Sequence, residues 1–256
     1  MSYTIDERNL ERQRLLADIL NPATRDVLAR LPKRPGAQVL DLGCGQGHTT
    51  RLLAEVLAPA SCIGLDFDEA LVSHATSHPD NPTVTSFQQG DATQLPFADA
   101  TFDVVFCRFL LVHMSDPVRV IREMLRVAKP DGFIVACEAD FAFEIAYPPE
   151  PALALINRIW QGLFQDPSVG RKLVTYFRAA GAREIQSGAA IQLEHDASTL
   201  KRTYRLTGEA TAPAAIAKGL ITETEAREMI DGLTRLEGDP ASVMMRFPDV
   251  WAIGRP

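Results

Sequence analysis

The stretch VLDLGCGQG, residues 39–47, decides the fold. A short apolar run ends there in Gly43, Gly45 and Gly47, and a helical pattern follows, marked by Leu52, Leu53, Val56 and Leu57. Glycines at a turn between a strand and a helix let the backbone turn tightly and approach a ligand closely. The amides that begin the helix favour an anionic group. The stretch therefore predicts a ligand-binding turn at the end of a buried strand.

Further apolar runs of strand length flank this turn, and helical patterns separate most of them. They cover residues 38–42, 62–66, 84–88, 102–107, 133–137, 182–193 and 246–254. Short apolar strands that alternate with helices are typical of a parallel sheet covered on both faces. We expect an α/β protein of the Rossmann-like type, with a mostly parallel seven-stranded sheet flanked by helices.

Three acidic residues mark the predicted ligand edge of this sheet. Asp41 precedes the glycine turn, Asp66 ends the second strand, and Asp91 follows the third. The carboxyl ends of parallel strands form the edge of an open α/β sheet at which ligands bind. At this edge, Asp66 can accept hydrogen bonds from two ribose hydroxyls, and Asp91 can accept one from an adenine amino group. The spacing G-x-G-x-G departs from the dinucleotide pattern G-x-G-x-x-G, and Asp41 would repel a pyrophosphate.

These stretches, together with GDA (90–92), LPF (95–97) and LRVAKPDG (125–132), resemble the class I S-adenosylmethionine (SAM)-dependent methyltransferases. The resemblance is strongest to the UbiE-like small-molecule methyltransferases and covers about residues 36–140. It implies SAM as the cofactor. The residues that it assigns to cofactor binding are Asp41, Gly43, Gly45, Gly47, Asp66, Phe67, Asp91, Ala92 and Arg108.

Within this set, the resemblance gives each residue a part of the cofactor. The three glycines would face the methionine end, Asp66 the ribose, and Asp91 with Ala92 the adenine, whose ring Phe67 would flank. Arg108 would pair with the SAM carboxylate. A structural ion pair is the alternative for Arg108.

The catalytic candidates follow the fourth and fifth predicted strands. His113 can take a proton near neutral pH, although a structural role in its loop is the alternative. Glu138 and Asp140 can orient an amine or a hydroxyl, or merely cap the chain. Aromatic residues in the same half of the chain predict a hydrophobic or planar acceptor: Phe141, Phe143, Tyr147, Trp160 and Tyr204.

The remaining segments suggest how the domain is organised. Residues 4–30 read as helical, and Asn21-Pro22 predicts a break into two helices. Residues 197–237 read as mainly helical and include the capping-box pattern Thr222-x-x-Glu225. We expect one methyltransferase domain over residues 1–256. Its parts are a helical lid (1–35, with Tyr3 and Arg14), a SAM-binding core (36–140) and an acceptor-side half (141–256) with a helical insertion near 197–240.

Composition narrows the class of partner. The formal net charge is -7 and no basic run is present, which argues against nucleic acid. Four cysteines without a CxxC pair predict buried thiols in a reducing compartment. The polar first residues are unlike a signal peptide, and no apolar stretch reaches the ~18 residues of a membrane span. We expect a cytoplasmic monomer or homodimer with a small-molecule acceptor, no membrane span and no metal.

The function that these features favour is transfer of a methyl group from SAM to oxygen, nitrogen or carbon of a small hydrophobic or aromatic metabolite, by direct displacement. One alternative is an NAD(P)-dependent oxidoreductase, which the glycine spacing and the absence of a Tyr-x-x-x-Lys pair disfavour. Another is a catalytically inactive SAM-binding regulatory module.

Overall fold

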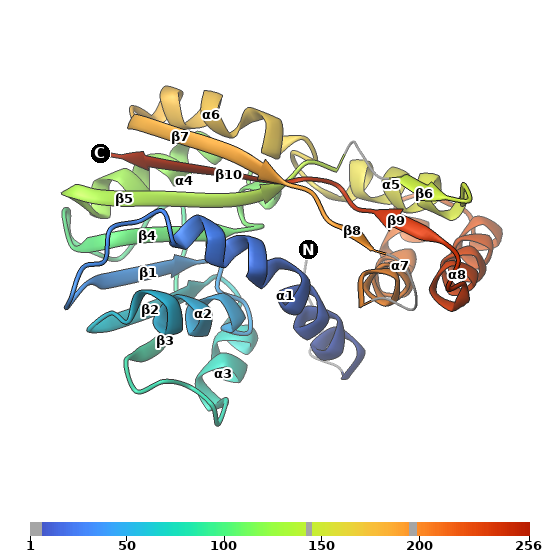
Figure 1. The fold of residues 1–256 in the computed structure, drawn as a ribbon, viewed down its shortest axis with the longest axis horizontal. Coiled ribbons are helices and arrows are strands. Elements are labelled where there is room, and N and C mark those ends of the chain that lie inside the picture. The colour runs from blue at the N-terminus through green and yellow to red at the C-terminus, as the bar shows by residue number, and fades with distance from the viewer. Residues whose placement is uncertain (1–6, 142–144, 195–198) are drawn as a thin grey trace.

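A seven-stranded sheet forms the centre of the protein (Figure 1). The computed structural model describes residues 7–141, 145–194 and 199–256. The strand order is β3-β2-β1-β4-β5-β10-β7. The first five strands in this order are parallel, and β10 is antiparallel to both of its neighbours. The bounds are β1 (Gln38–Leu42), β2 (Ser61–Asp66), β3 (Thr85–Gln89), β4 (Phe102–Arg108), β5 (Ala128–Ala139), β7 (Arg183–Ala190) and β10 (Asp249–Arg255). This confirms the predicted Rossmann-like, mostly parallel sheet.

Helices cover both faces of the sheet and also build a lobe beside it (Figure 1). Around the sheet are α1 (Glu7–Leu28), α2 (His48–Leu57), α3 (Glu69–Ser77), the short helix η1 (Leu111–His113), α4 (Pro117–Val127) and α6 (Val169–Ala180). The lobe contains α5 (Ala152–Leu163), α7 (Thr199–Ala217) and α8 (Glu223–Gly238). A three-stranded sheet in the order β6-β9-β8 joins them, with β6 (Ile145–Tyr147), β8 (Leu193–Glu194) and β9 (Val243–Met245). No helix in the described ranges is long and apolar enough to cross a lipid bilayer.

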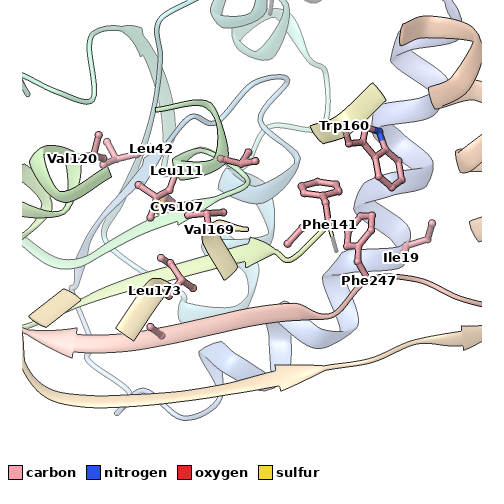
Figure 2. Close-up of a cluster of buried hydrophobic side chains, with 14 of the residues drawn as sticks. Ile19, Leu42, Cys107, Leu111, Val120, Phe141, Trp160, Val169, Leu173 and Phe247 are labelled. Atoms are coloured by element: carbon pink, nitrogen blue, oxygen red, sulfur yellow. The ribbon is translucent and has the colours of Figure 1, made fainter. Parts of the chain in front are cut away.

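The central strands are apolar on both faces because each face is buried. Successive side chains of a strand point to opposite faces. Leu42 of β1 therefore packs in the cluster that contains Val120 of α4, as Figure 2 shows, whereas Val39 packs with Leu28 of α1 and Leu53 of α2. The sheet is thus sandwiched between α1 and α2 on one side and α4 and α6 on the other.

The predicted break at Asn21-Pro22 is wrong, because α1 continues through Pro22. An internal proline costs a helix about 3 kcal/mol. Packing offsets this cost, since α1 buries an apolar stripe that consists of Leu15, Ile19, Leu20, Val27 and Leu28. The side chains of Asn21 and Thr24 also accept hydrogen bonds from Arg108 of β4. Tertiary contacts thus override the local preference.

The capping box predicted at Thr222 is present at the start of α8. The Thr222 hydroxyl accepts from the Glu225 amide, and the Glu225 carboxylate accepts from the Thr222 amide. Because α7 and α8 pack on each other and on α5 and α1, they form a wall opposite the carboxyl ends of the parallel strands (Figure 1).

Candidate functional site

A cavity of about 720 Å³ lies between the carboxyl ends of the parallel strands and the helices α1, α5 and α7. This edge is where open α/β sheets bind their ligands. Eight of the predicted site residues line the cavity: Gly43, Gly45, Asp66, Phe67, Asp91, Ala92, Arg108 and His113. Four others do not belong to its lining: Asp41, Gly47, Glu138 and Asp140. The structure thus brings together most, but not all, of the predicted set.

The glycine turn contains positions with two different roles. Gly45 has φ +52°, and a Cβ there would meet no atom within 4 Å, so the backbone faces open space. Gly47 has φ +78°, but a Cβ there would lie 2.7 Å from the Phe87 ring. Gly47 therefore allows α2 to start close to β3 and does not face the cavity. The resemblance had assigned both residues to the methionine end.

Asp66 fixes the turn and remains able to bind a ligand. Its Oδ2 accepts from the Gly45 amide at 2.8 Å, and its Oδ1 accepts from the Asp68 amide at 3.0 Å. A carboxylate oxygen can accept more than one hydrogen bond. Asp66 can therefore hold the turn and still accept from hydroxyl groups in the cavity.

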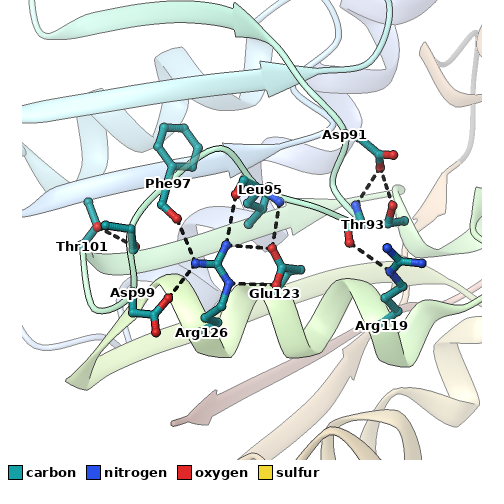
Figure 3. Close-up of polar contacts among 10 residues, drawn as sticks. Asp91, Thr93, Leu95, Phe97, Asp99, Thr101, Arg119, Glu123 and Arg126 are labelled. Carbon is teal, nitrogen blue, oxygen red and sulfur yellow. Dashed lines mark hydrogen bonds and ion pairs between the residues drawn. The ribbon is translucent and has the colours of Figure 1, made fainter.

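Asp91 is held in its ionised form at the same edge. Its Oδ1 accepts from the amide and from the hydroxyl of Thr93, both at 2.7 Å. These two hydrogen bonds lower the pKa of Asp91. Arg119 of α4 donates to the Thr93 carbonyl at 3.0 Å (Figure 3). The result is an anionic acceptor at a fixed place on the cavity wall.

The loop that follows Asp91 is tied to α4 by a second arginine as well. Arg126 donates to the carbonyls of Leu95 and Phe97, and it pairs with Asp99 and Glu123 (Figure 3). Glu123 in turn accepts from the Leu95 amide at 2.8 Å. This network was not anticipated from the sequence, and it anchors the chain on which Asp91 and Ala92 lie.

Asp41 lies behind the turn and not on the cavity surface. Only 1% of the residue is exposed, and its Oδ2 accepts from the Thr50 hydroxyl at 2.7 Å. Burial raises the pKa of Asp41 to about 7. The carboxyl group therefore links β1 to α2, which differs from the expected contact with the cofactor.

Arg108 reaches the cavity from the end of β4. Its Nη1 donates to Oδ1 of Asn21 at 3.0 Å and to Oγ1 of Thr24 at 3.1 Å. Both acceptors are neutral, and no ion pair within the described part of the chain includes Arg108. Burial lowers the pKa of the guanidinium. Of the two roles open for Arg108, the structural ion pair is therefore not formed.

His113 lines the cavity as part of η1. Its ring packs edge-to-face on Phe164, with the centroids 5.3 Å apart. Burial lowers the pKa of His113 to about 4. The imidazole is consequently neutral at pH 7. It helps to shape the cavity and places a weakly basic nitrogen in the cavity lining.

Glu138 and Asp140 are buried away from the cavity, which disagrees with a catalytic role. Oε1 of Glu138 accepts from the amides of Leu110 and Leu111 at 2.9 and 2.7 Å, and burial raises its pKa to about 8. Asp140 accepts two hydrogen bonds from the Arg171 guanidinium, at 2.5 and 2.7 Å. Both carboxyl groups therefore hold chain segments in place.

Aromatic rings form the opposite half of the cavity. Phe141 lies 4.4 Å from Phe247 and 5.0 Å from Trp160, centroid to centroid (Figure 2). Tyr204 of α7 packs on Trp160 at 5.3 Å, and Phe164 lies 4.8 Å from Phe141. We call these five residues the aromatic wall. Such contacts fit offset and edge-to-face packing and leave an apolar surface.

Phe164, Arg246 and Phe247 are among the cavity-lining residues that sequence reasoning missed. Arg246 is 1% exposed, makes a two-point ion pair with Asp249, and lies over the Phe247 ring at 4.3 Å. The R-x-x-D spacing of 246–249 was the available signal. Tyr147, by contrast, is 73% exposed and lies outside the lining, and Tyr3 and Phe143 lie outside the described residues.

Comparison with known proteins decides the family. Residues 40–136 match the family model described as a methyltransferase domain. The demethylmenaquinone methyltransferase of Mycobacterium sp. (strain KMS) is 34% identical over 198 residues, which cover 76% of this chain and 81% of that relative. The chain belongs to the class I SAM-dependent methyltransferases. This confirms the family inferred from the glycine turn and its acids.

Other relatives share different fractions of their length with this chain. The chain spans 46% of an uncharacterized transposon protein of Streptomyces fradiae, to which it is 31% identical over 158 residues. Among solved structures, the crystal structure of YcgJ from Bacillus subtilis has a TM-score of 0.61 at 25% identity and covers 93% of this chain and 99% of its own. The core fold is thus shared by proteins that differ in the segments outside it.

The residues of this methyltransferase fit SAM better than a dinucleotide. Arg108 is a partly buried cation with neutral partners, which suits a carboxylate. The Gly45 backbone borders open space, and the Phe67 ring is 75% exposed at the cavity edge. The Gly45 amide already donates to Asp66, so it is not available to a pyrophosphate.

Proposed function

We propose that this protein transfers a methyl group from SAM to oxygen, nitrogen or carbon of a small hydrophobic or aromatic acceptor. The observation that carries the proposal is a single cavity lined both by the Asp66 and Asp91 edge and by the aromatic wall. A cofactor at the sheet edge would then face an acceptor held between aromatic rings.

SAM supplies an electrophilic methyl group on a sulfonium, and the chain has to align the acceptor behind it and exclude water. Alignment can lower such a barrier by roughly 7–11 kcal/mol. We assign this alignment to the aromatic wall, whose rings are packed on one another and are therefore rigid. Asp66 and Asp91 would hold the nucleoside, and Arg108 the carboxylate.

A general base is needed only if the acceptor loses a proton during transfer. Of the three catalytic candidates, His113 alone lines the cavity. With a pKa of about 4, it is neutral and a weak base. We therefore propose that His113 mainly shapes the acceptor pocket and that acceptors already nucleophilic at neutral pH are preferred. Glu138 and Asp140 take no part in this proposal.

We further propose that the protein works in the cytoplasm as a monomer or homodimer. Four buried free cysteines support a reducing compartment. Gel filtration with light scattering would give the oligomeric state.

The test is release of S-adenosylhomocysteine (SAH) from SAM across phenols, carboxylic acids, amines, indoles and isoprenoid quinols. Binding of SAM would be measured in the same samples. Turnover on one class would establish methyl transfer and identify the acceptor chemistry. SAM binding without turnover on any class would favour the inactive regulatory module, and binding of NAD(P) in place of SAM would favour the oxidoreductase.

A further inference from the structure

We infer that Asn21 and Thr24 of α1 are positioning residues for the cofactor carboxylate, because they hold Arg108 while leaving its charge uncompensated. The inference rests on the proposed function, since it requires SAM in the cavity. Asn21 and Thr24 are 87 and 84 residues away from Arg108 in sequence. The contact is therefore a product of the fold and joins the N-terminal helix to the end of β4.

The geometry leaves part of the guanidinium available. Arginine carries five N–H donors, and Nη1 of Arg108 makes both bonds to α1. Among the described residues, the fully buried polar atoms without a hydrogen bond do not include Nε or Nη2 of Arg108. These nitrogens are therefore accessible, and Arg108 lines the cavity. A carboxylate in the cavity can receive a charge-assisted hydrogen bond from them.

The surrounding charged groups leave the Arg108 guanidinium without a direct counter-ion. Asp249, which faces Arg108, already forms a two-point ion pair with Arg246. Asp41 also attracts Arg108 but forms no ion pair with it, and because burial raises the pKa of Asp41 to about 7, this carboxyl group is only partly ionised at neutral pH. A guanidinium remains charged under all ordinary conditions. A partly buried cation without a direct counter-ion is a favourable partner for an anionic ligand group.

The choice of neutral residues on α1 is what keeps this charge free. Asn21 and Thr24 are three residues apart on one helix and thus share a face. The Thr24 hydroxyl donates its hydrogen to the Leu20 carbonyl at 3.0 Å, so its lone pairs are directed to Arg108. An aspartate at position 21 would hold the guanidinium equally well but would neutralise it. Asn21 and Thr24 therefore fix the position of the Arg108 guanidinium without neutralising its charge.

The experiment compares two ligands by isothermal titration calorimetry. SAH carries the amino-acid end, and 5′-methylthioadenosine lacks it. In Asn21→Asp we expect SAH to bind about tenfold more weakly, since the new carboxylate competes for Arg108. Affinity for 5′-methylthioadenosine should stay within twofold of wild type. The double variant Asn21→Ala/Thr24→Val should show the same selective loss, and Thr24→Ser should keep the wild-type ratio of the two affinities.

Arg8→Gln is the matched control, because it makes the same change in net charge at an exposed position of α1. It should leave both affinities unchanged. Equal losses for both ligands in Asn21→Asp, or no loss for either, would overturn the inference. If wild-type protein binds neither ligand, the proposed function itself fails. Binding of 5′-methylthioadenosine also reports that each variant is folded.

Discussion

Replacement of Glu138 by glutamine should change how stability depends on pH. Glu138 is fully buried, and burial raises the pKa of its carboxyl group from 4.5 to about 8 in the folded protein. Between these values the folded state binds a proton that the unfolded state does not. The free energy of unfolding must therefore fall as pH rises through this interval. Glutamine has no proton to lose, so the variant lacks this contribution.

The magnitude follows from the same two values. One pH unit corresponds to about 1.4 kcal/mol. Between about pH 5.5 and about pH 8, the wild type should lose roughly 3 kcal/mol of stability relative to Glu138→Gln. Near pH 5 the two proteins should be similarly stable, because the amide oxygen of glutamine can still accept from the Leu110 and Leu111 amides.

The assay is urea unfolding of both proteins at several pH values and constant ionic strength. Asp41, whose pKa is raised to about 7 by burial, also adds to the pH dependence, but it is present in both proteins and cancels in the difference. A difference in unfolding free energy that stays constant across this range would refute the reasoning, because it would show that Glu138 is already ionised in the folded protein at low pH.

Three further predictions follow from the site. Asp66→Ala should weaken SAH binding by about 1–3 kcal/mol in calorimetry, because it removes acceptors for the ribose and releases the Gly45 amide; unchanged affinity would contradict the assignment. Gly47→Ala should lower the thermal midpoint of unfolding more than Gly36→Ala does. Both glycines have positive φ, but only at position 47 would the added Cβ meet the Phe87 ring, at 2.7 Å. Equal shifts in the two variants would show that the Phe87 ring moves aside freely. His113→Gln should reduce kcat modestly and leave the pH profile of kcat/KM unchanged between about pH 6 and 8, because the neutral imidazole does not titrate there. A loss in kcat of about a thousandfold would identify His113 as a general base.

The half of the site that could be predicted is the half made by parallel strands. The carboxyl ends of adjacent strands meet at one edge, so Asp66 and Asp91 could be brought together from their positions alone. Arg108 was assigned from the family resemblance, and it also lies in the cavity lining. The resemblance could not show that Gly47 faces Phe87, because a three-dimensional contact between α2 and β3 decides that orientation.

The other half depends on packing between distant segments. Glu138 and Asp140 lie at the end of a strand as Asp66 does, but they point to η1 and α6 and not to the cavity. Residues such as Phe164 and Phe247 come from elements that meet only when the lobe folds against the sheet. A sequence pattern predicts the helices and strands, but it does not predict how they pack against one another.

The connection between the lobe and the main sheet limits how the acceptor pocket can adapt. The chain passes from the large sheet to the small one at 191–192 and returns at 246–248, and these two passages are bonded where the Arg246 amide donates to the Gln192 carbonyl. Two connections that are hydrogen-bonded to each other bend less easily than a single unbonded linker. We therefore expect the acceptor pocket to keep its shape, and the lobe not to hinge open and closed over the acceptor. Altering the size of the acceptor should require exchanging side chains of the aromatic wall, because lengthening a hinge would offer little.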